Sequence, residues 1–251
     1  MRATNLVHLA ETDSTNQWAA EHDDGTDLVV WTDYQTAGRG CGENSWESGR
    51  ALNLLFSMLI HPSDVSATAQ FRISMAIALA VVRELQCLLK ESGRNPEEIS
   101  IKWPNDIYWN DGKLGGILIE NRLSGANVRV SIIGVGLNVN QTVFTSDAPN
   151  PVSLCQITGR EYDRETLLRQ VVERFTLDIA PEDYRALLYR RQGCHTYTDS
   201  EGTFMAKLLT VEDDGHLLLA DTEGRHRRYA FKEVSFVLPT PPTIHTTHTT
   251  K

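Results

Sequence analysis

The stretch "KWPNDIYWNDGKLGGILIE" at residues 102–120 sets charged and amide side chains into a sequence that otherwise reads as two β-strands. Its apolar residues are mostly aromatic or β-branched, which favours strands, and "NDG" is a typical tight turn between them. Lys102, Asn105, Asp106 and Lys113 stand among these residues, although a turn needs none of them. Surface hairpins also carry such residues by chance. The mixture nevertheless favours a hairpin that presents a polar site.

Two glycines behind the turn predict a narrow slot. Gly115 and Gly116 follow Lys113, which begins the returning strand. Glycine inside a strand removes a side chain and lets a ligand approach the backbone closely. We therefore expect a ligand slot beside the Lys113 ammonium.

The surrounding segments extend this hairpin into a larger sheet. Residues 99–109, 113–123 and 127–140 are strand-like and are separated by the turn residues "NDG" and "SGAN", which predicts three consecutive antiparallel strands. Residues 67–90 repeat apolar side chains at helical spacing and predict a long helix. The fold class expected is α+β, with a mixed and largely antiparallel sheet.

The N-terminal part predicts a short strand followed by a helix that starts near Ser14. Residues 27–36 and 51–60 are two further strand candidates, and the loop "TAGRGCGENSW" at 36–46 lies between them. Its glycines can turn backbone N–H groups toward an anion, and Arg39 can bind phosphate or carboxylate. An ordinary flexible surface loop is the alternative for this segment alone.

Residues 163–192 predict two helices, and the sequence pattern changes after them. Short strands at residues 203–211, 216–221 and 227–238, separated by turns, then predict a small β-barrel or sandwich. We expect a catalytic domain at 1–192, the small β-domain at 193–238 and a disordered tail at 239–251, because the tail has too few apolar residues to bury.

Composition excludes several classes of protein. The chain has 251 residues and a net charge of −9, which argues against a nucleic-acid-binding surface spread over the molecule. Its four cysteines lie far apart without CxxC spacing, so neither zinc nor a disulfide framework is indicated, and a reducing cytoplasm fits best. No apolar run approaches the ~20 residues that cross a bilayer, so no membrane partner is expected.

Two more segments carry candidate ligand-binding groups. In "ETDSTNQ", Ser14, Thr15 and Asn16 bring hydroxyl, amide and free N–H groups together at a helix start, although for this segment by itself simple helix capping is the favoured interpretation. In "GVGLNVN", Asn138 interrupts an apolar strand and needs hydrogen-bond partners from the backbone or from a ligand.

In this order and at these separations, "ETDSTNQ", "YQTAGRG", "KWPNDIYWNDGKLGGILIE" and "GVGLNVN" resemble biotin-protein ligases, also called biotin-[acetyl-CoA-carboxylase] ligases, over about residues 6–238. The resemblance implies a catalytic domain like that of class II aminoacyl-tRNA synthetases and an SH3-like C-terminal domain. It also implies an enzyme that makes biotinyl-5′-AMP from biotin and ATP with Mg²⁺, then transfers biotin to a lysine of a biotin carboxyl carrier protein. Arg39 and Lys113 would meet at the activated acyl phosphate.

The resemblance also assigns roles to individual residues. Lys113 and Arg39 would be catalytic, and Asp106 would influence the Mg²⁺ ion. Biotin would be bound by Ser14, Thr15, Asn16, Gln35, Gly38, Arg39, Gly40, Cys41, Lys113, Gly115 and Gly116. ATP would be bound by Trp46, which would stack on adenine, and by Lys102, Asn105, Asp106 and Asn138.

The glycine loop departs from the family pattern. Many members continue as GRGRRG, whereas this chain reads Gly-Arg-Gly-Cys-Gly-Glu at residues 38–43. The lower positive charge predicts leakier retention of the adenylate, since loop closure protects a reactive mixed anhydride from water.

Other expectations concern partners and rival functions. The biotin motif begins at Glu11, which predicts the short, catalytic-only type without an N-terminal DNA-binding domain. Exposed strand edges near residues 128–140 would allow a homodimer. A lipoate-protein ligase or octanoyltransferase is the nearest alternative, although KWPND and Gln35 favour biotin. A non-catalytic biotin or nucleotide sensor is the alternative of another class, against which Arg39 and Lys113 together argue.

Overall fold

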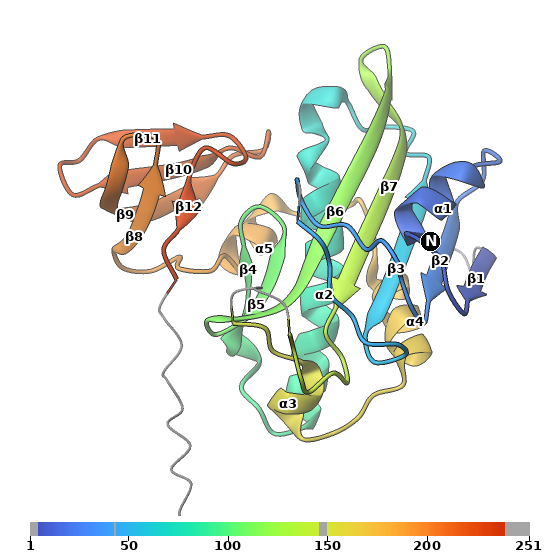
Figure 1. Ribbon diagram of the computed structural model, residues 1–251. Helices are drawn as coiled ribbons and strands as arrows, with labels where there is room; N and C mark the ends of the chain where they lie inside the picture. The colour runs from blue at the N-terminus through green and yellow to red at the C-terminus, as the bar shows by residue number, and fades with distance from the viewer. Residues whose placement is uncertain (1–4, 43, 146–149, 239–251) are drawn as a thin grey trace, which may run out of the picture.

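A computed structural model describes residues 5–42, 44–145 and 150–238, which form two β-sheets of unequal size together with helices (Figure 1). The predicted tail at 239–251 lies outside the described residues. The larger sheet has the strand order β1-β2-β3-β7-β6-β5-β4, in which β1 and β2 are parallel and all other neighbours are antiparallel. Its strands are β1 (Asn5–Leu9), β2 (Leu28–Thr32), β3 (Leu54–Ile60), β4 (Ile99–Lys102), β5 (Asp106–Trp109), β6 (Gly112–Ser124) and β7 (Asn127–Leu137).

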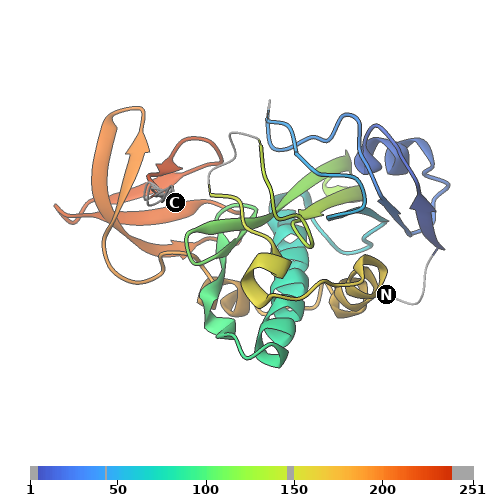
Figure 2. The ribbon, with the colours of Figure 1, turned by 60° about the horizontal axis from the view of Figure 1, so that its bottom comes forward.

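Helices cover both faces of the larger sheet, and β2 shows how the sequence specifies this. Leu28 and Val30 pack in the same apolar cluster as Ala19 of α1, whereas Val29 and Trp31 point into the main core that contains α2. Alternate residues of a strand face opposite sides of a sheet, so a strand buried on both sides is apolar throughout. Figure 2 shows α1 on one side of the sheet and α2 with α4 on the other. The helices are α1 (Thr15–Glu21), α2 (Phe71–Glu91), α3 (Leu154–Thr158), α4 (Arg164–Arg174) and α5 (Pro181–Ala186), with short 3₁₀ turns η1 (Ala67–Ala69) and η2 (Pro96–Glu98).

The α+β fold class is confirmed, and three details differ from the sequence expectations. The strand expected at 99–109 is two antiparallel strands, β4 and β5, joined by a turn that contains a cis Trp103–Pro104 bond. Proline lacks the N–H that a continuous strand would use. The expected helix at 67–90 begins with a 3₁₀ turn, and α3 was not predicted.

The expectation of exposed strand edges near residues 128–140 is wrong. Strand β7 pairs with β3 on one side and with β6 on the other, so its backbone groups are used within the sheet. The edges of this sheet are β1 and β4. No described helix is long and apolar enough to cross a bilayer.

The smaller sheet is antiparallel, with the order β11-β10-β9-β8-β12. Two of its features were not predicted. β8 was not expected, and the strand expected at 227–238 is interrupted at Lys232, whose φ of +71° turns the chain. The strands are β8 (His195–Asp199), β9 (Gly202–Val211), β10 (Leu217–Asp221), β11 (His226–Tyr229) and β12 (Ser235–Phe236).

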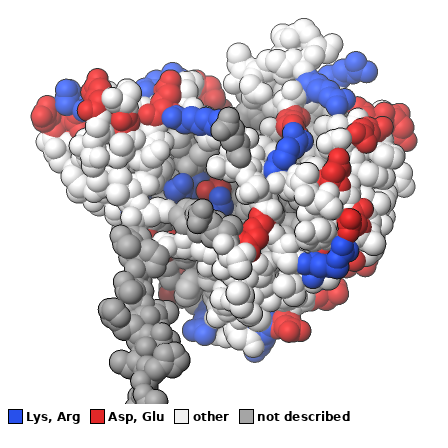
Figure 3. Space-filling view, in the orientation of Figure 1, with Lys and Arg blue, Asp and Glu red and all other residues white. Residues whose placement is uncertain are grey.

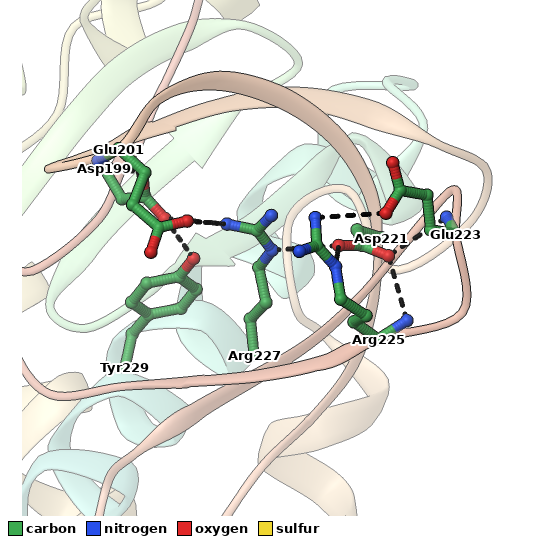
Figure 4. A network of polar contacts seen from close by, with 7 residues as sticks. All are labelled: Asp199, Glu201, Asp221, Glu223, Arg225, Arg227 and Tyr229. Carbon is green, nitrogen blue, oxygen red and sulfur yellow. Dashed lines mark hydrogen bonds and ion pairs between the residues drawn. The ribbon is translucent and has the colours of Figure 1, made fainter.

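An ion-pair network ties three strands of the smaller sheet together (Figure 4). Arg227 of β11 lies 3.1 Å from Asp199 of β8 and 3.0 Å from Asp221 of β10, and the Tyr229 hydroxyl also donates to Asp199. Burial raises the pKa of Asp221, but hydrogen bonds from the Arg225 backbone and from the two guanidinium groups outweigh it and lower that pKa to about 2. The network therefore stays charged near neutral pH and holds β11 in place.

The turn between β9 and β10 docks the smaller sheet onto the larger unit. The Trp103 indole N–H donates to the Gly215 carbonyl at 2.8 Å, and Arg185 of α5 donates to the Val211 carbonyl at 2.8 Å. A Cβ on Gly215 would lie 2.8 Å from the Phe71 ring, so glycine permits this close approach. Trp103 follows β4 directly, so the same turn that carries the polar motif also anchors the second sheet.

Candidate active site

A cavity of about 450 Å³ lies between the larger sheet, the loop after β2 and the smaller sheet. We call the described residues 36–42 and 44–46 the lid loop. Figure 3 shows basic and acidic side chains inside the hollow between the two parts of the molecule. The predicted site residues that line the cavity are Ser14, Thr15, Asn16, Gln35, Arg39, Gly40, Cys41, Trp46, Lys102, Asn105, Asp106, Lys113 and Gly116. Arg39 and Lys113 therefore line one cavity.

One end of the cavity is a buried group of neutral polar side chains, the hydroxyl–amide cluster: Ser14, Thr15, Asn16, Gln35 and Ser57. The Ser57 hydroxyl lies 2.6 Å from the Asn16 side-chain oxygen and 2.7 Å from the Thr15 hydroxyl. The Gln35 side-chain oxygen accepts from the Thr15 backbone N–H at 2.8 Å. Ser14 is the N-cap residue of α1, yet within the described chain its hydroxyl makes no capping hydrogen bond. That hydroxyl is therefore free to bind a ligand.

Three glycines form the floor of the cavity between its two ends. A Cβ on Gly134 would lie 2.3 Å from the Asn16 side-chain oxygen, and one on Gly136 would lie 2.5 Å from the Trp46 ring. Trp46 also covers Gly116, whose Cβ position is 3.2 Å from the indole. Among the described residues, the buried indole N–H of Trp46 has no hydrogen-bond partner. The indole thus rests on the floor where a flat ligand would lie.

The other end of the cavity carries two lysines around one carboxylate. The register of the β4–β5 hairpin places Lys102 opposite Asp106, and the ammonium and carboxylate are 3.8 Å apart. Lys113 of β6 lies 2.9 Å from the other oxygen of Asp106. Burial lowers the pKa of Lys102, with Asp106 opposing the shift and Lys113 adding to it. We call Lys102, Asp106 and Lys113 together the lysine site.

The lid loop closes over the cavity as a short hairpin in which Arg39 bridges to Ser45. The Arg39 guanidinium lies 3.3 Å from Glu120, and the Asn105 amide donates to the Cys41 sulfur at 2.8 Å. Burial raises the pKa of the Cys41 thiol, which disfavours the thiolate that covalent chemistry would need. Cys41 is therefore a packing residue of the lid.

Three predicted site residues lie outside the cavity lining. Asn138 is buried, and its amide donates to the backbone carbonyls of Lys113 and Val152, so it supports the strand that carries Lys113. A Cβ on Gly115 would lie 2.9 Å from a carbonyl oxygen of β7, and one on Gly38 would lie 2.8 Å from a carbonyl oxygen of the lid loop. These glycines allow close backbone packing, which is why their side-chain positions do not open into the cavity.

Several residues of the site were missed by sequence reasoning. Ser57 is a polar interruption of an apolar strand, and Glu120 is the last residue of the quoted motif; both signals were present. Glu120 accepts from the Asn16 amide at 2.8 Å as well as facing the lid arginine. Lys232 and Phe236 of the smaller sheet line the cavity without any signal in the sequence, because only the docking of the two units brings them there.

Comparisons with known proteins agree with this arrangement. Residues 9–138 match the biotin/lipoate A/B protein ligase family. The bifunctional ligase/repressor BirA of Bacillus subtilis is 30% identical over 237 residues, which cover 88% of this chain and 70% of that protein. The biotin–[acetyl-CoA-carboxylase] ligase of Paracoccus denitrificans is 32% identical over 173 residues, covering 66% of this chain and 70% of the relative.

Solved structures show the same fold. The biotin protein ligase from Aquifex aeolicus, solved in complex with biotin and ATP, superposes with a TM-score of 0.74 at 25% identity and covers 94% of this chain and 100% of its own. The match extends over the smaller sheet, which fits an SH3-like C-terminal domain. By its sequence match over more than half its length, this chain belongs to the biotin/lipoate A/B protein ligase family.

Proposed function

We propose that the protein is a biotin-protein ligase that joins biotin to ATP and passes the biotinyl group to a carrier lysine. In the first step a biotin carboxylate oxygen bonds to the α-phosphorus of ATP and pyrophosphate leaves. In the second step the amine of the carrier lysine bonds to the acyl carbon, AMP leaves and the amine loses a proton. The observation that best supports this proposal is one cavity with the hydroxyl–amide cluster at one end and the lysine site at the other.

The hydroxyl–amide cluster suits the ureido ring of biotin. Thr15, Asn16 and Gln35 offer donors and acceptors at positions fixed by hydrogen bonds within the cluster, whereas the Ser14 hydroxyl makes no capping hydrogen bond in the part of the chain that the structure describes. Buried polar groups left without partners are costly, so a ligand that hydrogen-bonds the Ser14 hydroxyl is favoured over one that does not. This argument separates biotin from lipoate and octanoate, whose apolar chains would leave that hydroxyl unpaired.

The lysine site suits the reacting phosphate. Lys113 and Arg39 would bind the carboxylate and the phosphate oxygens and stabilise the negative charge that accumulates as they join. Lys102 and Asn105 would contact the nucleotide. Trp46 would lie against the ligand, since its ring already occupies the glycine floor.

Mg²⁺ fits this site as a companion of ATP. Asp106 is the carboxylate that lines the described part of the cavity, and it already faces two ammonium groups. Mg²⁺ commonly binds one or two carboxylates together with substrate phosphates and water. Asp106 would help to hold the ion, and the ion would neutralise phosphate charge.

The acceptor we propose is a biotin carboxyl carrier domain of a carboxylase, in the cytoplasm. The family relatives named as acetyl-CoA-carboxylase ligases support this substrate. The four cysteines, all free thiols, are consistent with a reducing compartment.

The decisive experiment incubates the purified protein with biotin, ATP, Mg²⁺ and a biotin carrier domain. We expect biotin-dependent release of pyrophosphate and a mass increase of one biotinyl group on the carrier only when ATP is present. Biotin binding without pyrophosphate release would instead favour a sensor. Calorimetric titration with lipoate in parallel would overturn the assignment if lipoate bound tightly and biotin did not.

A further inference from the structure

We propose that Lys232, from the smaller sheet, binds a phosphate group of the nucleotide and completes the cavity above the tip of the lid loop. This inference rests on the proposed function and adds a nucleotide-binding residue from the second unit of the fold. Nothing in the sequence motifs points to Lys232, which lies far from them in the chain.

The position of Lys232 is the first observation. It follows β11 in the loop that leads to β12, and it lines the same cavity as Lys102 and Lys113. Its ammonium would lie 2.7 Å from a Cβ placed on Gly42, and it sits 5.6 Å from the centre of the Phe231 ring. The ammonium therefore reaches across from the smaller sheet to the lid tip.

The charge around the cavity is the second observation. Lys102 and Lys113 both face Asp106, and Arg39 faces Glu120. In contrast, neither an ion pair nor a hydrogen bond joins the Lys232 ammonium to any residue within 5–42, 44–145 or 150–238. A cation at the wall of a cavity that has no counter-ion among the described side chains raises the local concentration of anions, and phosphate oxygens are the anions that ATP brings.

The backbone of Lys232 is the third observation. Its φ of +71° lies in the left-handed region, where residues other than glycine and asparagine are uncommon. Holding a lysine there is unfavourable, because its Cβ approaches the backbone more closely than a glycine does. Glycine would satisfy the turn at lower cost, so the presence of a lysine points to a use for its ammonium.

The lid loop supplies the physical reason for that use. It carries one arginine at residues 36–42, and the tip residue Gly42 has no side chain to fill the space beneath Lys232. Positive charge that the lid lacks is thus provided from the opposite wall. If Lys232 and the lid loop bind the same phosphate, the position of the smaller sheet also affects how well the adenylate is retained.

The test is the variant Lys232→Gly in the full chain, because glycine removes the ammonium and relieves the positive φ together. We expect the KM for ATP to rise about tenfold, as for the loss of one charge-assisted hydrogen bond, while the Kd for biotin alone changes less than about twofold. We also expect the adenylate to dissociate faster, measured as free biotinyl-5′-AMP. The melting temperature should stay the same or increase, so a folding defect is excluded as the cause.

Two further variants complete the test. Lys232→Arg, which keeps a cation, should restore most of the ATP affinity. Lys207→Ala, at an exposed lysine of β9 on the same sheet, should leave the KM for ATP unchanged. An unchanged KM for ATP and unchanged adenylate release in Lys232→Gly would overturn the proposal. The wild-type reaction separates this outcome from failure of the proposed function, because the wild-type protein must first release pyrophosphate with biotin and ATP.

Discussion

The two ends of the cavity are built from different chemistry. The hydroxyl–amide cluster is neutral and dry: Ser14, Thr15 and Asn16 are exposed by only 3–5%. The side chains of the lysine site are charged and 17–23% exposed. One end offers fixed hydrogen-bond geometry, whereas the other offers charge that water can still reach.

This difference assigns different tasks to the two ends. Hydrogen-bond donors and acceptors in fixed positions discriminate between similar neutral ligands, because a wrong ligand leaves buried groups unpaired. Lysines around one carboxylate discriminate less between similar ligands, but they attract and stabilise a polyanion such as ATP. We therefore expect changes at the first end to alter biotin affinity and changes at the second end to alter nucleotide binding and chemistry.

Replacing Lys113 should have the largest effect. In Lys113→Ala the reacting phosphate loses a cation, and Asp106 keeps only Lys102, at 3.8 Å. The rate of biotin-dependent pyrophosphate release should fall about 10²- to 10³-fold, the range seen when one preorganised electrostatic group is removed. Stopped assays of pyrophosphate would measure the reaction with ATP, and calorimetry with biotin alone would measure biotin binding separately.

A matched control for that variant is Lys90→Ala, at an exposed lysine in the last turn of α2. It should leave the rate unchanged. A loss of less than about tenfold in Lys113→Ala would contradict an electrostatic role for Lys113.

The neutral end should respond most to Gly134→Ala. The new Cβ would lie 2.3 Å from the Asn16 side-chain oxygen, so Asn16 must leave its hydrogen bond with Ser57. Leaving such buried groups unpaired costs about 1–3 kcal/mol, which predicts a roughly thirtyfold rise in the Kd for biotin. The KM for ATP should change little.

A double variant identifies the cause of that effect. If the Cβ acts only through Asn16, Asn16→Ala and Asn16→Ala/Gly134→Ala should bind biotin with the same Kd. A much weaker double variant would mean that the Cβ obstructs the ligand itself.

The charged end should depend on pH, whereas the neutral end should not. An amine is charged below its pKa, and burial lowers the pKa of Lys102 from the ordinary value of 10.5. As pH rises, Lys102 therefore loses its charge earlier than a free lysine, and the KM for ATP should increase about fivefold across the alkaline range. Because arginine stays charged there, Lys102→Arg should flatten this increase. If the Kd for biotin rose with pH as much as the KM for ATP, the two ends would not differ in their dependence on charge.

The sequence allowed most of the fold and much of the site to be predicted, for a physical reason. Lys102, Asp106 and Lys113 all lie within the stretch at 102–120, so their meeting is local in sequence, although Lys102 and Asp106 face each other across the β4–β5 hairpin and not along the single strand expected at 99–109. Periodicity likewise marks α2. The prediction of the short strands was wrong where Pro104 and Lys232 interrupt runs of strand-forming residues, because a turn inside such a run has only a weak sequence signal.

Contacts between distant segments were the part that could not be predicted. Ser57 meets Thr15 across 42 residues, and the second sheet reaches the cavity only because Trp103 binds the turn at Gly215. Asn138 shows a related ambiguity: its buried amide N–H groups donate to two backbone carbonyls, so its place in an apolar strand also has a structural explanation. A polar residue in an apolar strand predicts a partner without saying which one.

Glu120 connects the lid loop to the neutral end, and its replacement should have the smallest effect. One of its carboxylate oxygens accepts from Asn16 at 2.8 Å and from Arg39 at 3.3 Å, so it joins the lid arginine to the neutral cluster. Glu120→Gln keeps an oxygen for Asn16 but removes the ion pair, whose partners are 49% and 42% exposed. Exposed pairs contribute at most about 1 kcal/mol, so the Kd for biotin should rise about two- to threefold, with faster dissociation as the lid loosens. Glu120→Leu, which also leaves the Asn16 amide unpaired, should weaken binding further, and tighter binding in Glu120→Gln would show instead that the ion pair holds Arg39 away from the ligand.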